Sequence, residues 1–178
     1  MDKTGDYLDV ETYEQALDFS NLLKMLSDAQ SQADETGAEE VLDALLRMSA
    51  TSDIASSLVA SLALFSSCLH SFMEEPSVVE VLLALLKNVC KQDGSAVTFC
   101  SPRNVALIVQ AMTEHEEGEE TLMEMGCLLV EVLAKGNAEG AKALIEGGIE
   151  DRLNKASTVI TNVRNQKYVV AAQAALQG

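Results

Sequence analysis

Large aromatic side chains are nearly absent from this sequence. It has 178 residues, of which 48% are hydrophobic but only 4% aromatic, and it contains no tryptophan. Its core must therefore consist of leucine, valine, isoleucine and alanine, which favours layers of helices over a sheet sandwich built around large rings. Proline occurs only twice, and the ten glycines fall mostly between apolar stretches. This pattern predicts helices of ordinary length joined by short loops.

Histidine is also scarce, and no motif of enzyme chemistry or metal binding is present. The only histidines are His70 and His115. A hydrogen-bonded packing role is favoured for His70, and the glutamates around His115 are expected to form a solvated loop rather than a cation site. The sequence has no G-x-G-x-x-G or Walker pattern and no D-x-D-x-D-G calcium loop. We therefore expect a protein that is not an enzyme, with no catalytic, cofactor-binding or metal-binding residue.

Basic residues are few: the chain has 12 lysines and arginines against 28 acidic residues, a formal net charge of −16. Residues 1–40 hold eleven acids and two bases (2 − 11 = −9), whereas the residues after Asp151 hold four bases and no acid (+4). A strongly negative chain repels polyanions, so nucleic-acid binding is not expected. The gradient is compatible with head-to-tail contacts or with an acidic partner at the basic end. The alternative is that these charges only keep the protein soluble.

The four cysteines form no C-x-x-C pair, and each lies among apolar residues: Cys68, Cys90, Cys100 and Cys127. No histidine or cluster of bases adjoins them, as a cysteine nucleophile would require. Buried reduced thiols are the favoured interpretation. They predict an intracellular, reducing compartment, with the cytoplasm as the first choice. The acidic N-terminus also lacks the apolar stretch of a signal peptide.

One segment has the length and composition of a membrane-spanning helix. No charged residue interrupts Ile54–Met73, and about 20 apolar residues are enough to cross a bilayer. Serines, however, recur at helical spacing on one side of this segment, opposite leucines and phenylalanines. We therefore interpret it as a helix packed between neighbours and expect no membrane insertion. The serines are Ser56, Ser57, Ser61, Ser67 and Ser71.

A helical phrase recurs at a spacing of about forty residues. Aligned on Leu46, Leu86 and Val130, its copies are 40 (86 − 46) and 44 (130 − 86) residues apart. A period in this range is typical of helical solenoids, which offer surfaces to other macromolecules and seldom carry chemistry of their own. The copies are Val41–Met48, Val81–Asn88, Gly126–Ala134 and, more weakly, Val170–Leu176.

Periodicity and breaker residues divide the chain into about ten helices with almost no candidate strand. Residues 1–12 are expected to be loosely ordered and residues 13–178 to form one helical-repeat domain. Ser77 and Glu80 have the spacing of a capping box, and Ser101-Pro102 is typical of a helix start. Besides the second and third copies of the phrase, the predicted helices cover 13–29, 38–49, 54–72, 101–115, 138–146, 149–159 and 167–177, with a looser stretch at 91–100.

From Asn104 to Gly178 the chain resembles the armadillo repeat family. Residues 38–100 fit the family more loosely, and residues 1–37 fit only as a partial or capping unit. Three segments carry the resemblance in the family's order: a second helix at Val105–His115, a third helix at Gly126–Ala134, and a short first helix with its glycine turn at Gly136–Ile149.

The resemblance implies a right-handed superhelix of about three to four three-helix repeats, whose third helices line a concave groove. In that family an asparagine near the end of the third helix often holds the backbone of an extended peptide. Asn88 matches this position, whereas Met48 and Val132 replace it in the neighbouring copies, and the tryptophans of nuclear-import members are missing. If the register holds, five residues lie on or beside the groove: Arg47, Lys87, Asn88, Glu131 and Lys135. The alternative is that these groups only solubilise the surface.

The last helix offers a second candidate surface, a stripe of apolar and small residues. We expect this stripe to pack on a partner or on a second copy of the chain, or else backward on the preceding helices. Together these patterns predict a non-catalytic scaffold or adaptor whose partner is an extended protein segment or a second helical protein. The alternative is a structural subunit of a large multiprotein assembly. The stripe consists of Val169, Val170, Ala172, Ala175 and Leu176.

Overall fold

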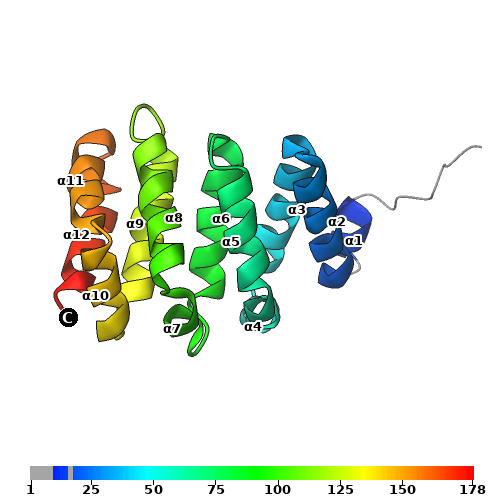
Figure 1. Cartoon of the computed structure of the whole chain (residues 1–178), viewed down its shortest axis with the longest axis horizontal. Coiled ribbons are helices and arrows are strands. Elements are labelled where there is room, and N and C mark those ends of the chain that lie inside the picture. The colour runs from blue at the N-terminus through cyan, green and yellow to red at the C-terminus, as the bar shows by residue number, and fades with distance from the viewer. Residues whose placement is uncertain (1–9, 16–17) are drawn as a thin grey trace, which may run out of the picture.

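The computed structural model describes residues 10–15 and 18–178, and within these ranges the chain is all-helical, as predicted (Figure 1). No strand occurs in the described residues. The elements are α1 (Val10–Gln15), α2 (Phe19–Gln32), α3 (Glu35–Met48), α4 (Ser52–Leu58), the 3₁₀ turn η1 (Val59–Ser61), α5 (Leu62–Ser71), α6 (Pro76–Val89), α7 (Ser95–Phe99), α8 (Pro102–Glu114), α9 (Glu120–Ala134), α10 (Ala138–Glu146), α11 (Ile149–Val159) and α12 (Gln166–Leu176).

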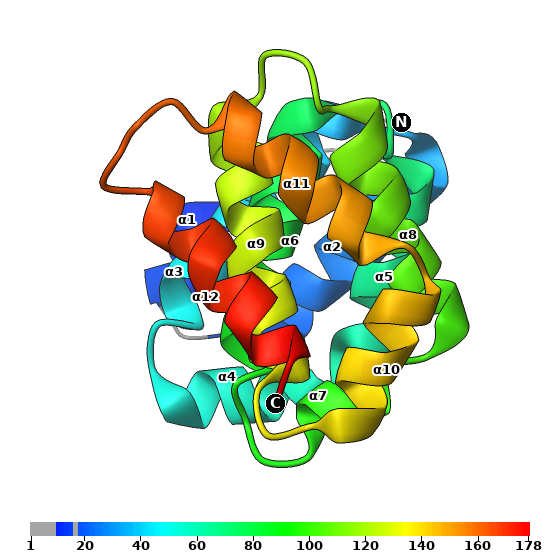
Figure 2. The same ribbon diagram turned by 90° about the vertical axis from the view of Figure 1, so that its left-hand side faces the viewer.

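The helices stack in rows along the long axis of the molecule. In one row, α3, α6, α9 and α12 pack each on the next, and in a second row α2, α5, α8 and α11 do the same. The short helices α4, α7 and α10 lie along one side of the stack, its lower edge in Figure 1, where α7 contacts α10. Figure 2 looks along the stack and shows α12 in front of α9, with α11 beside it. The forty-residue period thus corresponds to one layer of this arrangement.

Helix α6 lies at the centre of the stack and is buried on two sides. It packs on α3 on one side and α9 on the other, and α5 covers it as well. Its run Val81–Leu86 contains no polar residue because layers flank the helix on both sides, and the polar residues of α6 lie nearer its two ends. The residues of α6 that are withdrawn from solvent are Val78, Val79, Leu82, Leu83, Ala84, Leu85, Leu86 and Val89.

Several predicted boundaries are confirmed. Ser101 caps α8, since its side-chain oxygen accepts a hydrogen bond from the Asn104 amide at 3.3 Å, and Pro102 begins the helix. Gly148, between α10 and α11, has φ of 86°, the left-handed conformation that glycine adopts without strain. Gly94, the residue before α7, has φ of 76° and is also left-handed.

Other boundaries differ from the prediction. The helix expected over 13–29 is two helices: α1 ends at Gln15, and α2 begins after Asp18, whose carboxylate accepts from the Asn21 amide at 3.2 Å. The loosely ordered N-terminus falls mainly on residues 1–9, outside the described ranges, while α1 begins at Val10. Within the stretch 91–100, expected to be loose, the chain forms α7.

The predicted capping box is wrong. Helix α6 already begins at Pro76, because proline favours the first helical position, and Glu75 is its N-cap residue without a side-chain bond. Ser77 therefore lies inside the helix, where its hydroxyl donates to the Glu39 carboxylate at 3.0 Å and joins α6 to α3.

One described helical stretch, Ser52–Ser71, is long and apolar enough to cross a membrane by length and composition alone. It is interrupted by η1, so the single helix predicted at 54–72 is α4 and α5 with a 3₁₀ turn between them. Its serine stripe is used within the fold. The Gln30 side-chain amide donates to the hydroxyls of Ser67 and Ser71, at 2.6 and 2.9 Å, so these serines hold α5 against α2.

Candidate functional site

The five predicted groove residues all lie towards the C-terminal ends of three consecutive helices of one row. Arg47 is in the last turn of α3, Lys87 and Asn88 are in the last turn of α6, and Glu131 and Lys135 are at the end of α9. Cations are favoured there because the carbonyl ends of helices carry a partial negative charge.

A hollow of about 580 Å³ opens between the ends of α6 and α9, and the turn and helix of α7 form one wall of it. It brings together three of the five predicted residues, Lys87, Glu131 and Lys135, but neither Arg47 nor Asn88. The sequence did not point to the other members. The remaining lining residues are Cys90, Lys91, Gln92, Asp93, Gly94, Ala96, Val97, Leu128, Val132, Gly136 and Asn137.

Arg47 is occupied by a partner within the chain. Its guanidinium donates two hydrogen bonds to the Glu14 carboxylate, at 2.8 and 2.7 Å, and so ties α3 to α1. These hydrogen bonds lower the pKa of Glu14 and raise that of Arg47. Arg47 is therefore a link between the first helices rather than a free groove cation.

Asn88 also joins two layers. Its side-chain amide donates to the Ser49 hydroxyl at 2.9 Å, and Ser49 follows α3 directly. Ser49 in turn donates to the Leu46 carbonyl at 2.7 Å, so the asparagine extends a hydrogen-bonded chain across the α3–α6 interface. A peptide held by Asn88 would have to share or replace this bond.

Lys87 is the half-buried cation of the hollow. Desolvation lowers the pKa of Lys87, and the positive charge of Lys91 lowers it further. No carboxylate of the described residues lies within ion-pairing distance of the Lys87 ammonium. Lys135, by contrast, lies 3.9 Å from the Glu131 carboxylate.

The opposite ends of the same helices carry acids. The pKa of Glu80 is raised, first by burial and then by the charges of Glu119, Asp43 and Glu124. These residues belong to α3, α6, and α9 with its N-cap position. The α3–α6–α9 surface is therefore acidic towards its helix N-termini and basic towards its helix C-termini.

Replacing Glu80 by glutamine is expected to stabilise the protein at neutral pH. A carboxyl whose pKa is higher in the folded state than in the unfolded state opposes folding when it is charged, and this cost disappears as the pH falls through the raised value. Glu80→Gln should raise the Tm by about 1–3 °C at pH 7. The difference should shrink towards pH 4, where the wild-type carboxyl is protonated, and Glu117→Gln on the exposed α8–α9 loop is the matched control. A gain that is independent of pH would contradict this explanation.

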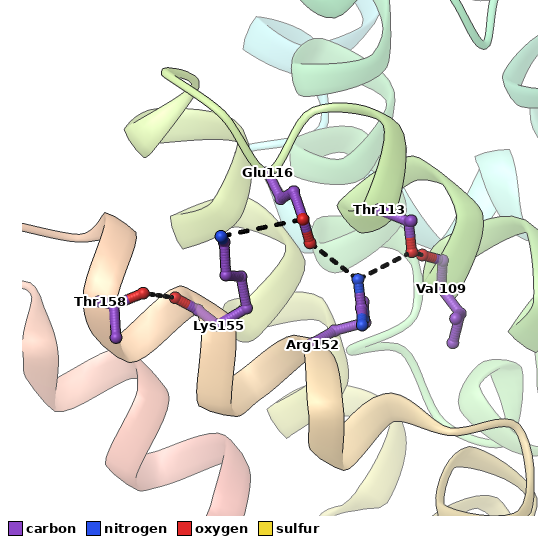
Figure 3. Close-up of polar contacts among 6 residues, drawn as sticks. All are labelled: Val109, Thr113, Glu116, Arg152, Lys155 and Thr158. Carbon is purple, nitrogen blue, oxygen red and sulfur yellow. Dashed lines mark hydrogen bonds and ion pairs between the residues drawn. The ribbon is translucent and has the colours of Figure 1, made fainter.

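The acidic loop after His115 holds the protein's own cations (Figure 3). Arg152 of α11 donates to the Glu116 carboxylate at 2.8 Å and to the Thr113 hydroxyl at 3.3 Å, and the Lys155 ammonium lies 3.8 Å from Glu116. The expectation of a merely solvated loop is thus wrong for Glu116. Part of the charge gradient seen in the sequence is internal pairing, because two of the four C-terminal bases attach α11 to this loop.

The segment before α12 is attached in a similar way. Glu120 accepts hydrogen bonds from the Thr161 hydroxyl at 2.9 Å and from the Asn162 amide at 3.0 Å, which lower the pKa of Glu120. The Asn165 side chain donates to Glu124 at 2.6 Å. Acids of α9 therefore position the chain that leads into α12.

The C-terminal stripe does not form one open face. Val169, Ala172 and Leu176 are buried, and α12 packs chiefly on α9, so the alternative of backward packing describes these three residues. Val170 is 63% exposed and Ala175 is half-buried. A second hollow of about 570 Å³ lies between α10 and α12, and its lining includes Ile145, Ala175 and Leu176.

The burial of the two histidines is the reverse of what the sequence predicted. His70 is exposed at the end of α5, so its predicted packing role is wrong. His115 is buried, and its Nε2 lies 2.7 Å from the Met73 carbonyl oxygen, which requires a proton on that nitrogen. In the described part of the chain, no group of three or more histidine, cysteine, aspartate or glutamate side chains is arranged to hold a metal ion.

A scan against protein-family models, a search of curated proteins and a search of solved structures each found no match to this chain. The resemblance to armadillo repeats therefore depends on the residues and on the order of the helices alone.

Proposed function

We propose that this chain is a non-catalytic protein-interaction module, a scaffold or adaptor, that binds a protein partner on the α3–α6–α9 surface. The observation that carries the proposal is the hollow between α6 and α9. It combines the ammonium of Lys87, which no described carboxylate pairs, with partly accessible apolar side chains, and it includes three of the five residues expected at a groove. Such a mixture of an apolar floor and a few charged groups is typical of recognition sites.

We further propose that the stack is an armadillo-like right-handed superhelix of about three to four repeats. The order of the helices supports this, since three successive units each contribute a short helix, a second-row helix and a first-row helix: α4–α5–α6, α7–α8–α9 and α10–α11–α12. A single unit of this size buries too little apolar surface to fold alone, so the layers depend on each other. With the net charge of −16 and the four thiols, the proposal includes an intracellular, reducing location, no membrane insertion and no nucleic-acid partner.

The second candidate function is a structural subunit of a larger assembly, joined through the C-terminal end of the stack. It is favoured by the exposure of Val170 and by the apolar hollow between α10 and α12. A second copy of the chain is one occupant of this end. Light scattering of the purified protein tests that occupant, because a monomer at all concentrations contradicts self-association.

Site-specific crosslinking tests the proposed groove. A photoreactive amino acid replaces Val97, which is 60% exposed at the hollow, or Ala106, which is exposed on α8. A partner on the α3–α6–α9 surface should crosslink in cells at position 97 and not at position 106. The captured protein, once purified, should bind Val97→Asp about tenfold more weakly than wild type and bind Ala106→Asp unchanged. Equal crosslinking at both positions, or equal affinity of both variants, would contradict a partner at this surface.

A further inference from the structure

The half-buried lysines and arginines of this protein differ in whether a carboxylate of the chain pairs with them. Among the described lysines and arginines, only Lys87, Arg152 and Lys155 are half-buried, and the others are exposed. Arg152 and Lys155 share the Glu116 carboxylate. Lys87 has no such counter-ion among the acids that the structure describes, although the protein is strongly acidic. A desolvated charge without a counter-ion is costly, so a carboxylate that reaches Lys87 from a partner gains binding free energy by neutralising it.

The hollow around Lys87 is basic in an acidic protein. Lys87, Lys91 and Lys135 line it, against Asp93 and Glu131, so its lining carries 3 − 2 = +1 while the whole chain carries −16. Glu131 lies beside Lys135, which leaves the Lys87–Lys91 side the more positive. Two cations that repel each other gain most from a carboxylate placed between them.

Apolar side chains surround these cations. Val97 is 60% exposed, and Ala96, Leu128 and Val132 are half-buried around the hollow. A ligand that fits must therefore present both a carboxylate and aliphatic groups. The two acids in the lining and the net charge of the chain repel a ligand as highly charged as a nucleic acid.

We infer that the hollow between α6 and α9 receives an acidic segment of the partner protein, with a glutamate or aspartate carboxylate on the Lys87 ammonium and apolar side chains against Leu128 and Val132. This inference rests on the proposed function and specifies the chemistry of its partner. Lys91 supplies the second positive charge, and the exposed face of α7 closes the site on one side.

Peptide binding to the purified full chain tests this inference. The probe is a fluorescein-labelled peptide in which glutamates alternate with leucines, compared with peptides carrying glutamine or lysine in place of glutamate. Fluorescence anisotropy should show the glutamate peptide binding about tenfold more tightly than the glutamine peptide, and salt should weaken its binding. The lysine peptide should bind weakest.

Three variants assign the binding to this hollow. Lys87→Gln should weaken the glutamate peptide about tenfold, whereas Lys24→Gln, which removes the same charge from exposed α2, should leave its affinity unchanged. Glu131→Gln should strengthen binding a few-fold because it removes a repulsive carboxylate from the lining. The Tm of Lys87→Gln should be equal to or slightly above that of wild type, since the variant removes a desolvated charge.

Equal affinities of Lys87→Gln and Lys24→Gln, equal binding of the glutamate and glutamine peptides, or Lys87-dependent binding of a single-stranded oligonucleotide would each overturn the inference. These results are distinct from a failure of the proposed function. If a partner crosslinks at position 97 but binds Lys87→Gln as tightly as wild type, the α3–α6–α9 surface is still the binding surface. Only the inference that an acidic segment contacts Lys87 is then contradicted. Absence of crosslinking at position 97 contradicts the proposed function, because it means that no partner binds at this surface.

Discussion

Replacing Phe99 by alanine is expected to lower the free energy of unfolding by about 3–5 kcal/mol, the range for deleting a fully buried phenylalanine. Phe99 is 1% exposed and ends α7, a helix of five residues that is too short to form without tertiary contacts. It belongs to the main apolar core, and α7 packs on α9 and α10. Because a typical domain is stable by only about 5–15 kcal/mol, this one side chain accounts for a large part of the total.

The Phe99→Ala substitution should loosen the structure around residue 99 as well as lower the stability of the whole protein. The Phe99 carbonyl accepts a hydrogen bond from the Asn104 side chain at 2.9 Å, so movement of residue 99 also loosens the start of α8. Denaturant unfolding gives the change in free energy, and hydrogen exchange of residues 95–99 should show the earliest loss of protection. Val97→Ala is the matched control on the same helix. Val97 is 60% exposed, so its truncation should change stability by less than about 0.5 kcal/mol. Similar losses in the two variants would mean that α7 is not anchored through Phe99.

The sequence predicted the helical class and the layer spacing because both follow from local periodicity. Leu46, Leu86 and Val130, on which the repeated phrase was aligned, lie on α3, α6 and α9, three neighbours of one row. Helix starts were predictable where one residue decides them, as at Ser101. Helix starts were not predictable where two signals compete. At the start of α6, the preference of Pro76 for the first helical position overrides the capping-box spacing of Ser77 and Glu80.

The candidate site was predicted only in part, because its geometry depends on contacts between distant segments. The pairing of Arg47 with Glu14 joins residues 33 positions apart, and nothing local in the sequence marks it. Among the lining residues that the sequence analysis missed, Lys91 could have been predicted, since it follows Lys87 by the spacing of one helical turn. Val97 belongs to α7, whose five residues are too few to show a hydrophobic period.

Burial was the least predictable property. A helical stripe shows which residues share a face, but not what covers that face. Val169 and Val170 were therefore grouped, although the structure buries the first and leaves the second 63% exposed. His70 and His115 were interpreted from their sequence neighbours, whereas the bond from His115 to the Met73 carbonyl spans 42 positions.

Thiol reagents are expected to react with the native protein far more slowly than with the unfolded chain. Cys68, Cys90 and Cys127 are buried, and burial raises the pKa of each thiol to about 12 from an ordinary value of 9.0. The thiolate is the reactive form, so at a fixed pH near 8 this shift lowers its fraction about a thousandfold. Nucleophilicity increases with pKa and restores about twentyfold, which leaves a net slowing of about fiftyfold from ionisation alone. Exclusion of the reagent from the core slows the reaction further.

Cys100 should react first among the four. It is half-buried, and the pKa of its thiol is raised to about 11 rather than 12. Labelling with iodoacetamide followed by peptide mass spectrometry measures each site separately, and the same reaction in denaturant gives the reference rate for the unfolded chain. Val97→Ala should label like wild type, whereas Phe99→Ala should label faster at Cys100, one residue from the truncated side chain. Rapid labelling of Cys127 in the native protein would contradict the packing of α9, because its sulfur is fully buried between neighbouring layers.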